Sequence, residues 1–186
     1  MCGYREFLTL TAALLLSVGT AVADDHDGES RKGKNHDAVA SMVNAGGERT
    51  GMIRVQEGPE GVVLRVSLKG LPPGWKAIHI HEKGTCDDHH GGFTDSGGHL
   101  DPLDRQHGLL NDEGPELGDL PNIWVHEDGR VKAEIYAPGV TLNGEGSGLL
   151  AGDGTAFVIH EGPDDHRTQP IGGAGSRIAC GVVRQP

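Results

Sequence analysis

Residues 77–81 read Ala-Ile-His-Ile-His, an alternation of apolar and polar side chains that is typical of a β-strand. Successive side chains of a strand leave opposite faces, so the imidazoles of His79 and His81 leave the same face. The rise of a strand places them about 6.5 Å apart, close enough to bind one metal ion. A lone His-x-His pair is a weak signal, because an exposed or hydrogen-bonded pair fits the pattern equally well.

Strand-like runs continue on both sides of residues 77–81 and predict an all-β protein. Turn sequences such as Pro72-Pro73-Gly74 and Asp128-Gly129 separate them, and no segment longer than two turns shows a helical period. The other runs span residues 38–43, 50–56, 61–68, 122–125, 131–136, 155–159 and 178–183. Eight short strands predict an antiparallel β-sandwich or flattened barrel.

Two long segments, residues 82–120 and 160–177, interrupt this regular spacing of strands. They hold most of the chemically capable side chains of the chain. Long ordered loops are usually functional, so we expect the site to be built from these two loops.

The first residues have the character of an export signal. Arg5 precedes an apolar run at residues 7–16, and Ala21-Val22-Ala23 follows as an A-x-A cleavage site. Residues 1–23 are therefore predicted to be a secretory signal peptide, with a retained amphipathic anchor as the alternative. Residues 24–37 are predicted to be a disordered polar lead, and residues 38–186 a single domain. We expect the mature protein in the periplasm or outside the cell.

The formal net charge is −11. Such an acidic surface argues against nucleic acid as a partner and, once the signal peptide is removed, against an anionic membrane. An anionic substrate requires a local positive group that overcomes the field of the whole molecule.

Export leaves two cysteines, Cys86 and Cys180, and an even count in an oxidising compartment predicts one disulfide. It closes a loop of 94 residue steps (180 − 86) and stabilises the fold by roughly 4 to 5 kcal/mol in the chain-entropy model. The alternative is a pair of buried free thiols. The bond would hold the loop that follows His81.

Histidines from three separate segments indicate a metal site. His99 lies in a glycine-rich loop, and His160 ends an apolar strand. Taken alone, His99 could be an ordinary loop residue and His160 a structural histidine. Together with His79 and His81 they form an imidazole-only set that suits copper or zinc, of which only copper changes oxidation state. A second cluster of mixed ligands, His107 and Asp119, is typical of zinc.

These segments together resemble the copper/zinc superoxide dismutases, in their secreted bacterial form, over residues 38–186. The resemblance is carried by H-I-H-E at 79–82, G-G-H-L-D-P at 97–102, the histidine at 107, L-G-D-L-P-N at 117–122, V-I-H-E at 158–161 and G-A-G-S-R-I-A-C-G-V at 173–182. It implies an eight-stranded Greek-key β-sandwich or flattened barrel with two long functional loops.

The resemblance also implies a role for each matching residue. Copper is expected on His79, His81, His99 and His160. Zinc is expected on His99, shared with copper, and on His107 and Asp119. By position, Arg177 lies at the mouth of the copper channel, Asp164 ties a copper histidine to a zinc histidine, and Cys86 and Cys180 form the disulfide.

One zinc ligand departs from the family pattern, because Glu116 stands where a third zinc histidine is expected. Glutamate oxygen ligates zinc at about 2.0 to 2.2 Å, so Glu116 is a chemically suitable replacement. Three outcomes are open: Glu116 binds zinc, His89 or His90 takes its place, or zinc is weak or absent. We favour Glu116.

The implied reaction is the disproportionation of superoxide to dioxygen and hydrogen peroxide. His99 would carry a proton used to form the peroxide, and Arg177 would draw the anion through an acidic exterior. The 160–177 loop has no lysine near Arg177, which predicts weak electrostatic guidance.

The sequence leaves two alternative functions open, and the resemblance suggests one oligomeric state. A copper-only dismutase is suggested by Glu116, and a non-catalytic copper- or zinc-binding protein on the same scaffold is the rival from another class. Because many secreted relatives are dimers, the resemblance also makes a homodimer an expectation.

Overall fold

The computed structural model describes Met1, Gly3 and residues 37–186. The predicted signal peptide (1–23) and polar lead (24–37) lie outside the described residues, apart from Met1, Gly3 and Asp37. Among the described residues, no helix is long and apolar enough to cross a membrane.

The described part of the chain is all-β, as predicted, and contains no α-helix. Its strands are β1 (Ala38–Asn44), β2 (Arg49–Gly58), β3 (Gly61–Leu68), β4 (Gly74–Lys76), β5 (Ile78–His81), β6 (Ile123–Val125), β7 (Val131–Pro138), β8 (Ala156–His160) and β9 (Arg177–Arg184). Two 3₁₀ turns, η1 (His89–Gly91) and η2 (Thr94–Ser96), lie in the loop after β5. Each predicted run overlaps a strand. The predicted count of eight is not confirmed, because β4 is an additional strand, whose first residue, Gly74, belongs to the predicted turn Pro72-Pro73-Gly74.

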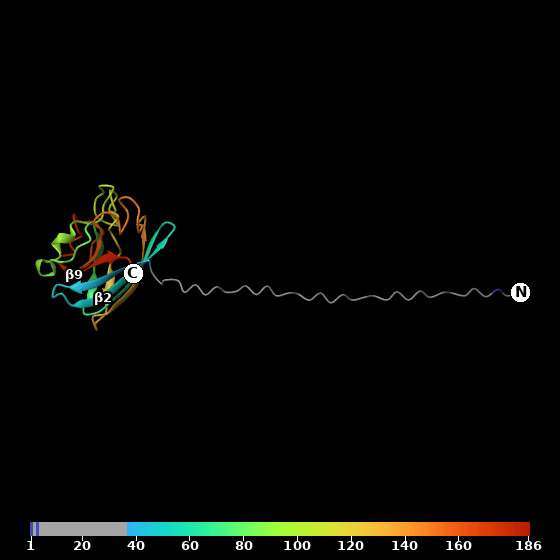
Figure 1. Ribbon diagram of the computed structural model, residues 1–186, viewed down its shortest axis with the longest axis horizontal. Helices are drawn as coiled ribbons and strands as arrows, with labels where there is room; N and C mark the ends of the chain where they lie inside the picture. The colour runs from blue at the N-terminus through green and yellow to red at the C-terminus, as the bar shows by residue number, and fades with distance from the viewer. Residues whose placement is uncertain (2, 4–36) are drawn as a thin grey trace. The chain divides into compact units, whose positions relative to one another are not determined.

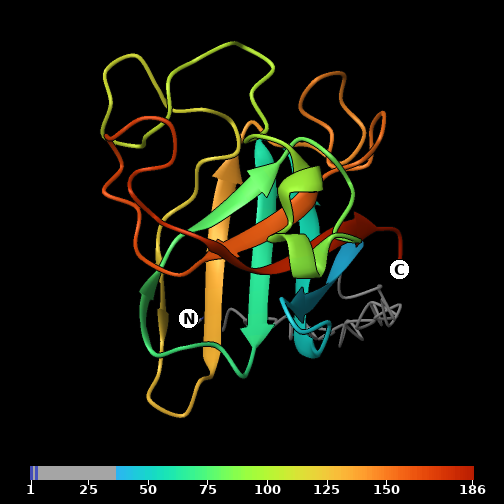
Figure 2. The same ribbon diagram turned by 90° about the vertical axis from the view of Figure 1, so that its left-hand side faces the viewer.

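Seven strands form one antiparallel sheet in the order β5-β8-β9-β1-β2-β3-β7, and β4 pairs with β6. The sheet curls on itself, so that β5, β8 and β9 cross the direction of β2, β3 and β7 (Figure 1, Figure 2). Right-handed strand twist accumulates over seven strands and favours this curling. The curled antiparallel sheet agrees with the predicted sandwich or flattened barrel.

The apolar core lies between the two halves of the curled sheet. Ile80 of β5 and Phe157 of β8 are fully buried in the same cluster as Leu64 of β3. Burying a side chain of this size contributes about 1.5–3 kcal/mol. Because side chains alternate, the same strand that places Ile80 in the core sends His79 and His81 to the opposite face. All four residues of β5 are buried, so loops must cover that outer face.

The disulfide between Cys86 and Cys180 is present, with a Cα–Cα separation of 5.8 Å. It joins the loop after β5 to β9. Both cysteines belong to a small second apolar cluster with Phe93 and Val158, on the outer face of β8. This cluster anchors the loop that covers the two histidines of β5.

Candidate metal centre

Strand alternation and register bring three histidines to one face. His79 and His81 leave the outer face of β5, and β8 pairs antiparallel beside it. His160 ends β8 at an irregularity in the β8–β9 register, a type of feature that re-aims a side chain near functional sites. The ring centroids of His79 and His160 lie 4.9 Å apart.

The loop after η2 brings two further site residues against β5. The Ile80 amide donates to the carbonyl of Gly118, 2.9 Å away, and a Cβ on Gly118 would lie 2.3 Å from the Ile80 carbonyl oxygen. Only glycine permits so close an approach of two backbones. This contact sets His99 and Asp119 opposite the two histidines of β5 as bridge partners.

The four histidines each direct one ring nitrogen at a common point. Each offers one ligand atom, and these atoms all lie within 4.8 Å of one another. Each of these four imidazoles has one buried ring nitrogen without a hydrogen-bond partner: His79 Nδ1, His81 Nε2, His99 Nε2 and His160 Nε2. A buried polar atom without a partner costs about 1–3 kcal/mol. Four such nitrogens converging on one point fit the donor set of a copper ion.

The remaining ring nitrogens fix the orientation of these imidazoles. His81 Nδ1 lies 3.0 Å from the Gly97 carbonyl oxygen, and His160 Nδ1 lies 3.1 Å from that of Gly175. Each carbonyl can only accept, so both Nδ1 atoms carry hydrogen and both Nε2 atoms hold a free lone pair. The rings are thereby set in the tautomer that ligates metal.

Burial keeps three of these imidazoles neutral. Desolvation lowers the pKa of His79 to about 4, against the opposing effect of Asp164. It also lowers the pKa of His160 to about 3, helped by the nearby charge of His79. Desolvation is also the main reason why the pKa of His81 lies well below its ordinary value. Neutral imidazole is the form that binds metal, so near neutral pH no proton competes at these positions.

A second cluster lies on the other side of His99 and contains two carboxylates. His99 Nδ1 is 2.6 Å from Glu116 Oε2 and 3.4 Å from Asp119 Oδ1. His107 Nδ1 is 2.6 Å from Asp119 Oδ1 and 3.4 Å from Glu116 Oε2. Two imidazole nitrogens and two carboxylate oxygens are the mixed donor set that zinc accepts.

His79 also falls within ligand distance of His99, His107 and Asp119. Its Nε2, however, lies 3.0 Å from Asp164 Oδ2, while its Nδ1 is the atom left without a partner. We therefore count His79 with the four-histidine cluster. Glu116 is counted with the carboxylate cluster because its Oε2 lies 2.6 Å from His99 Nδ1 and 3.4 Å from His107 Nδ1.

The carboxylate cluster favours positive charge. Burial opposes the ionised form of Asp119, yet hydrogen bonds from His107 and His99 hold the pKa of Asp119 well below its usual range. Burial also acts against the charged form of His107, but bonds to Asp119, Asp164 and Glu116 raise the pKa of His107 to about 11. A site that holds protons this firmly is also suited to a divalent cation.

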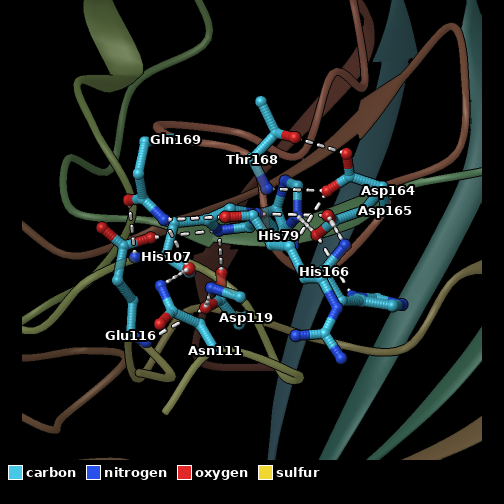
Figure 3. A network of polar contacts seen from close by, with 12 residues as sticks. His79, His107, Asn111, Glu116, Asp119, Asp164, Asp165, His166, Thr168 and Gln169 are labelled. Carbon is cyan, nitrogen blue, oxygen red and sulfur yellow. Dashed lines mark hydrogen bonds and ion pairs between the residues drawn. The ribbon is translucent and has the colours of Figure 1, made fainter. Parts of the chain in front are cut away.

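Asp164 connects the two clusters and is itself buried (Figure 3). Its Oδ2 lies 3.0 Å from His79 Nε2, and its Oδ1 lies 3.1 Å from His107 Nε2. One carboxylate thus accepts from one histidine of each cluster.

Arg177 is fixed beside the four-histidine cluster. Its Nη1 donates to the Phe93 carbonyl at 2.6 Å and to Ser96 Oγ at 2.9 Å, and its Nη2 donates to the Gly97 carbonyl at 2.8 Å. The Gly97 carbonyl is also the acceptor for His81 Nδ1. The guanidinium is therefore a half-buried positive charge that shares a hydrogen-bond acceptor with an imidazole of the cluster.

The structure brings together all the predicted ligand residues, including Glu116. His89 and His90 both lie in η1 with their ring centroids 4.3 Å apart, and they join neither cluster found in the described part of the chain. Asn122 and Gln169, which were not predicted as site residues, contact site residues across the two loops. Asn122 lies within the L-G-D-L-P-N motif, whereas no local pattern marks Gln169.

Comparison with known proteins agrees with this geometry. The model of the copper/zinc superoxide dismutase family matches residues 49–183. The Cu-Zn superoxide dismutase of Caulobacter vibrioides is 48% identical over 151 residues, covering 79% of this chain and 86% of that protein. The crystal structure of a SOD-like protein from Bacillus subtilis superposes with a TM-score of 0.73 at 38% identity, covering 77% of this chain and 96% of that chain. The Cu/Zn superoxide dismutase of Brucella abortus gives a TM-score of 0.64 at 28% identity, covering 80% of this chain and all of that chain. The chain therefore belongs to the copper/zinc superoxide dismutase family.

Proposed function

We propose that this superoxide dismutase binds copper through His79, His81, His99 and His160, and zinc through His99, His107, Glu116 and Asp119. The observation that carries the copper assignment is the convergence of four buried ring nitrogens that have no partner. The pairing of Glu116 and Asp119 with two imidazoles supports the zinc assignment.

The reaction joins two superoxide anions and two protons to give one dioxygen and one hydrogen peroxide. One anion loses an electron to become dioxygen, and the other gains that electron and both protons. Bound copper supplies this chemistry because it accepts and returns a single electron. The protein must then attract the anion, place it and deliver a proton.

Arg177 is suited to attract and place the anion. Its guanidinium is held by three acceptors, so it presents a fixed positive charge that does not have to reorganise when superoxide arrives. A fixed local charge is required because the chain as a whole carries −11.

His99 is suited to deliver a proton. Its Nε2 faces the four-histidine cluster, and its Nδ1 is held by Glu116 and Asp119. Burial lowers the pKa of His99, but the hydrogen bonds to Asp119 and Glu116 dominate and raise it above the ordinary value. When Nε2 is not engaged by the metal, it can therefore hold a proton and give it to the forming peroxide.

A copper-only dismutase is the second candidate, and Glu116 in place of the third zinc histidine is the observation that favours it. Measuring both metals in the reconstituted protein separates the two. One zinc per chain, lost on combined replacement of Glu116 and Asp119, supports the mixed site. Copper without zinc in an active enzyme establishes the copper-only form, and both metals without turnover establish a non-catalytic metal-binding protein.

Two further parts of the proposal concern the setting of the enzyme. The Cys86–Cys180 disulfide is consistent with an oxidising compartment, and it supports export to the periplasm or the outside. The net charge of −11 argues against nucleic acid and, after removal of the signal peptide, against an anionic membrane as partners. Mass spectrometry of the exported protein tests cleavage after Ala23. The homodimer stays a prediction, which sedimentation analysis of the mature protein tests.

A further inference from the structure

Two side-chain amides connect the loop after β5 to the loop between β8 and β9, at the residues that link the two clusters. Asn122 Nδ2 donates to the Asp164 carbonyl at 2.8 Å, and the Asp164 amide donates to Asn122 Oδ1 at 2.9 Å. Gln169 Nε2 donates to the His107 carbonyl at 2.8 Å, and the His107 amide donates to Gln169 Oε1 at 3.0 Å.

In both contacts, one side-chain amide pairs with the N–H and the C=O of a single residue. In one contact the amide comes from the first loop, and in the other it comes from the second loop. A planar amide carries one donor and one acceptor side by side, so it can pair with both the N–H and the C=O of one residue. Asn122 lies just before β6 and holds a residue of the second loop, whereas Gln169 lies in the second loop and holds a residue of the first. Figure 3 shows the Gln169 side chain next to His107.

These two amide contacts, called clamps below, hold Asp164 and His107, whose side chains are hydrogen-bonded to each other. With its N–H and C=O both paired to Asn122, Asp164 has a fixed backbone, and its carboxylate reaches His79 and His107. The His107 N–H and C=O are both paired to Gln169, and the C=O also accepts from Asn111 Nδ2 at 3.0 Å. The His107 backbone is therefore fixed, and its ring lies between Asp119 and Asp164. The hydrogen bond between the His107 ring and the Asp164 carboxylate therefore joins two residues whose backbones are each held by a side-chain amide.

The loops have other ties that do not involve the clamped residues. The Leu110 amide donates to the His166 carbonyl at 3.1 Å, and Arg167 Nη1 donates to the Leu110 carbonyl at 2.6 Å. Removal of one amide clamp therefore leaves the two loops joined and changes how firmly one site residue is held.

We propose that Gln169 and Asn122 are positioning residues, which hold His107 and Asp164 in ligand-ready places before metal binds. For zinc affinity, the inference rests on the proposed zinc assignment of His107. It assigns no contact with metal or substrate to either amide.

Gln169 is the better residue to test, because its exposed side chain can be replaced with little risk to folding. Gln169→Leu removes both hydrogen bonds to His107, together with the bond from Nε2 to the Arg167 carbonyl at 3.1 Å within the same loop. Gln169→Glu keeps the acceptor for the His107 amide but loses both bonds that Nε2 donates. Gln106→Leu is the matched control, since Gln106 is also exposed, precedes His107 directly and makes no side-chain bond to it; its side chain pairs with Glu113 and Asn111. Asn111 Nδ2 keeps its own bond to the His107 carbonyl, at 3.0 Å, in both leucine variants.

The first measurement is zinc affinity of the copper-loaded protein, by competition with a chelator. Loss of an outer contact that orients a metal ligand lowers metal affinity by about 10–100-fold. We expect zinc affinity to fall by about tenfold in Gln169→Leu and by less in Gln169→Glu. Gln106→Leu should leave zinc affinity unchanged. Cobalt(II) placed in the zinc site should show shifted visible bands in Gln169→Leu alone. Equal affinities and equal spectra for the two leucine variants would overturn the role in zinc binding.

The second measurement is amide hydrogen exchange of the metal-free protein around His107. The wild type and Gln106→Leu should protect this amide, and Gln169→Leu should lose the protection. Unchanged protection in Gln169→Leu would overturn the proposal that the site is held before metal arrives. If the wild type takes up no zinc, the zinc assignment fails, and this exchange measurement alone decides the positioning role.

Discussion

Glu116 Oε2 lies 2.6 Å from Nδ1 of His99, the side chain whose Nε2 is directed at the four-histidine cluster. A carboxylate therefore stands beside the imidazole shared by the two clusters, at the position where the family pattern has a histidine. With Asp119 it gives the second cluster two negative charges, which makes a bound dication less positive than one held by three histidines and one aspartate.

Replacing this carboxylate tests whether it is a zinc ligand. We expect Glu116→Gln to lower zinc affinity by at least tenfold, because a neutral amide oxygen replaces an anionic donor. Glu116→His should keep zinc, since imidazole is also a zinc ligand. Chelator competition measures both. Glu113→Gln, an exposed carboxylate of the same loop, is the control, and equal affinities for the two glutamine variants would exclude Glu116 as a ligand.

The carboxylate that links the clusters gives a second prediction. Asp164→Asn keeps the shape of the side chain but offers only one acceptor oxygen, so His79 and His107 cannot both donate to it. We expect about a 10–100-fold loss of zinc affinity and an altered copper electron paramagnetic resonance spectrum. The neighbouring Asp165→Asn is a matched control, because the Asp165 side chain bonds only within its own loop. Identical spectra for both variants would contradict the linking role.

The buried histidines predict how the metal-free protein responds to acid. The pKa values of His79 and His160 are lowered to about 4 and about 3 in the fold, so between pH 6.5 and 5 the unfolded chain takes up protons that the folded chain does not. The free energy of unfolding should therefore fall over this interval, by roughly 1–2 kcal/mol per histidine. The pKa values of His99 and His107 are raised instead, so their contribution to the free energy of unfolding depends on pH in the opposite direction. That contribution is lost as pH rises above 6.5.

Urea unfolding of the metal-free protein at pH 6.5 and pH 5 measures this difference. His160→Gln removes one of the groups and should reduce the difference between the two pH values. A free energy of unfolding that does not change between them would show that the four-histidine cluster is not held in its buried form without metal.

The charge distribution predicts a weak dependence of the rate on salt. Residues 161–176 contain no lysine, and their one arginine, Arg167, is bonded to the Leu110 carbonyl. Arg177 attracts superoxide at short range while the chain as a whole, at −11, repels it, and salt screens both effects. We expect the rate to change by less than about threefold between low and physiological ionic strength. A fall of tenfold or more, as for strongly steered enzymes, would contradict this.

The sequence predicted the parts of the fold and site that depend on local patterns. Alternation at residues 77–81 predicts a strand and puts two imidazoles on one face, and the structure confirms both. The even count of cysteines that is expected after removal of residues 1–23 predicts the disulfide, which is present. The roles of the individual ligands came from the family resemblance, because spacing alone does not say which loops meet.

Features that depend on contacts between distant segments could not be predicted in this way. The place of Glu116 beside His99 depends on the close approach of Gly118 to Ile80, and the clamp of Gln169 on His107 joins residues 62 positions apart. β4 was missed because its first residue, Gly74, belongs to the predicted turn Pro72-Pro73-Gly74, which leaves only two residues of the strand.

The most direct test of the account is the rate of superoxide loss in one sample of mature protein, measured before and after copper is added to the zinc-loaded form. We expect one copper and one zinc per chain, no turnover before copper is added and fast turnover afterwards. Full occupancy by both metals with no superoxide turnover would contradict it.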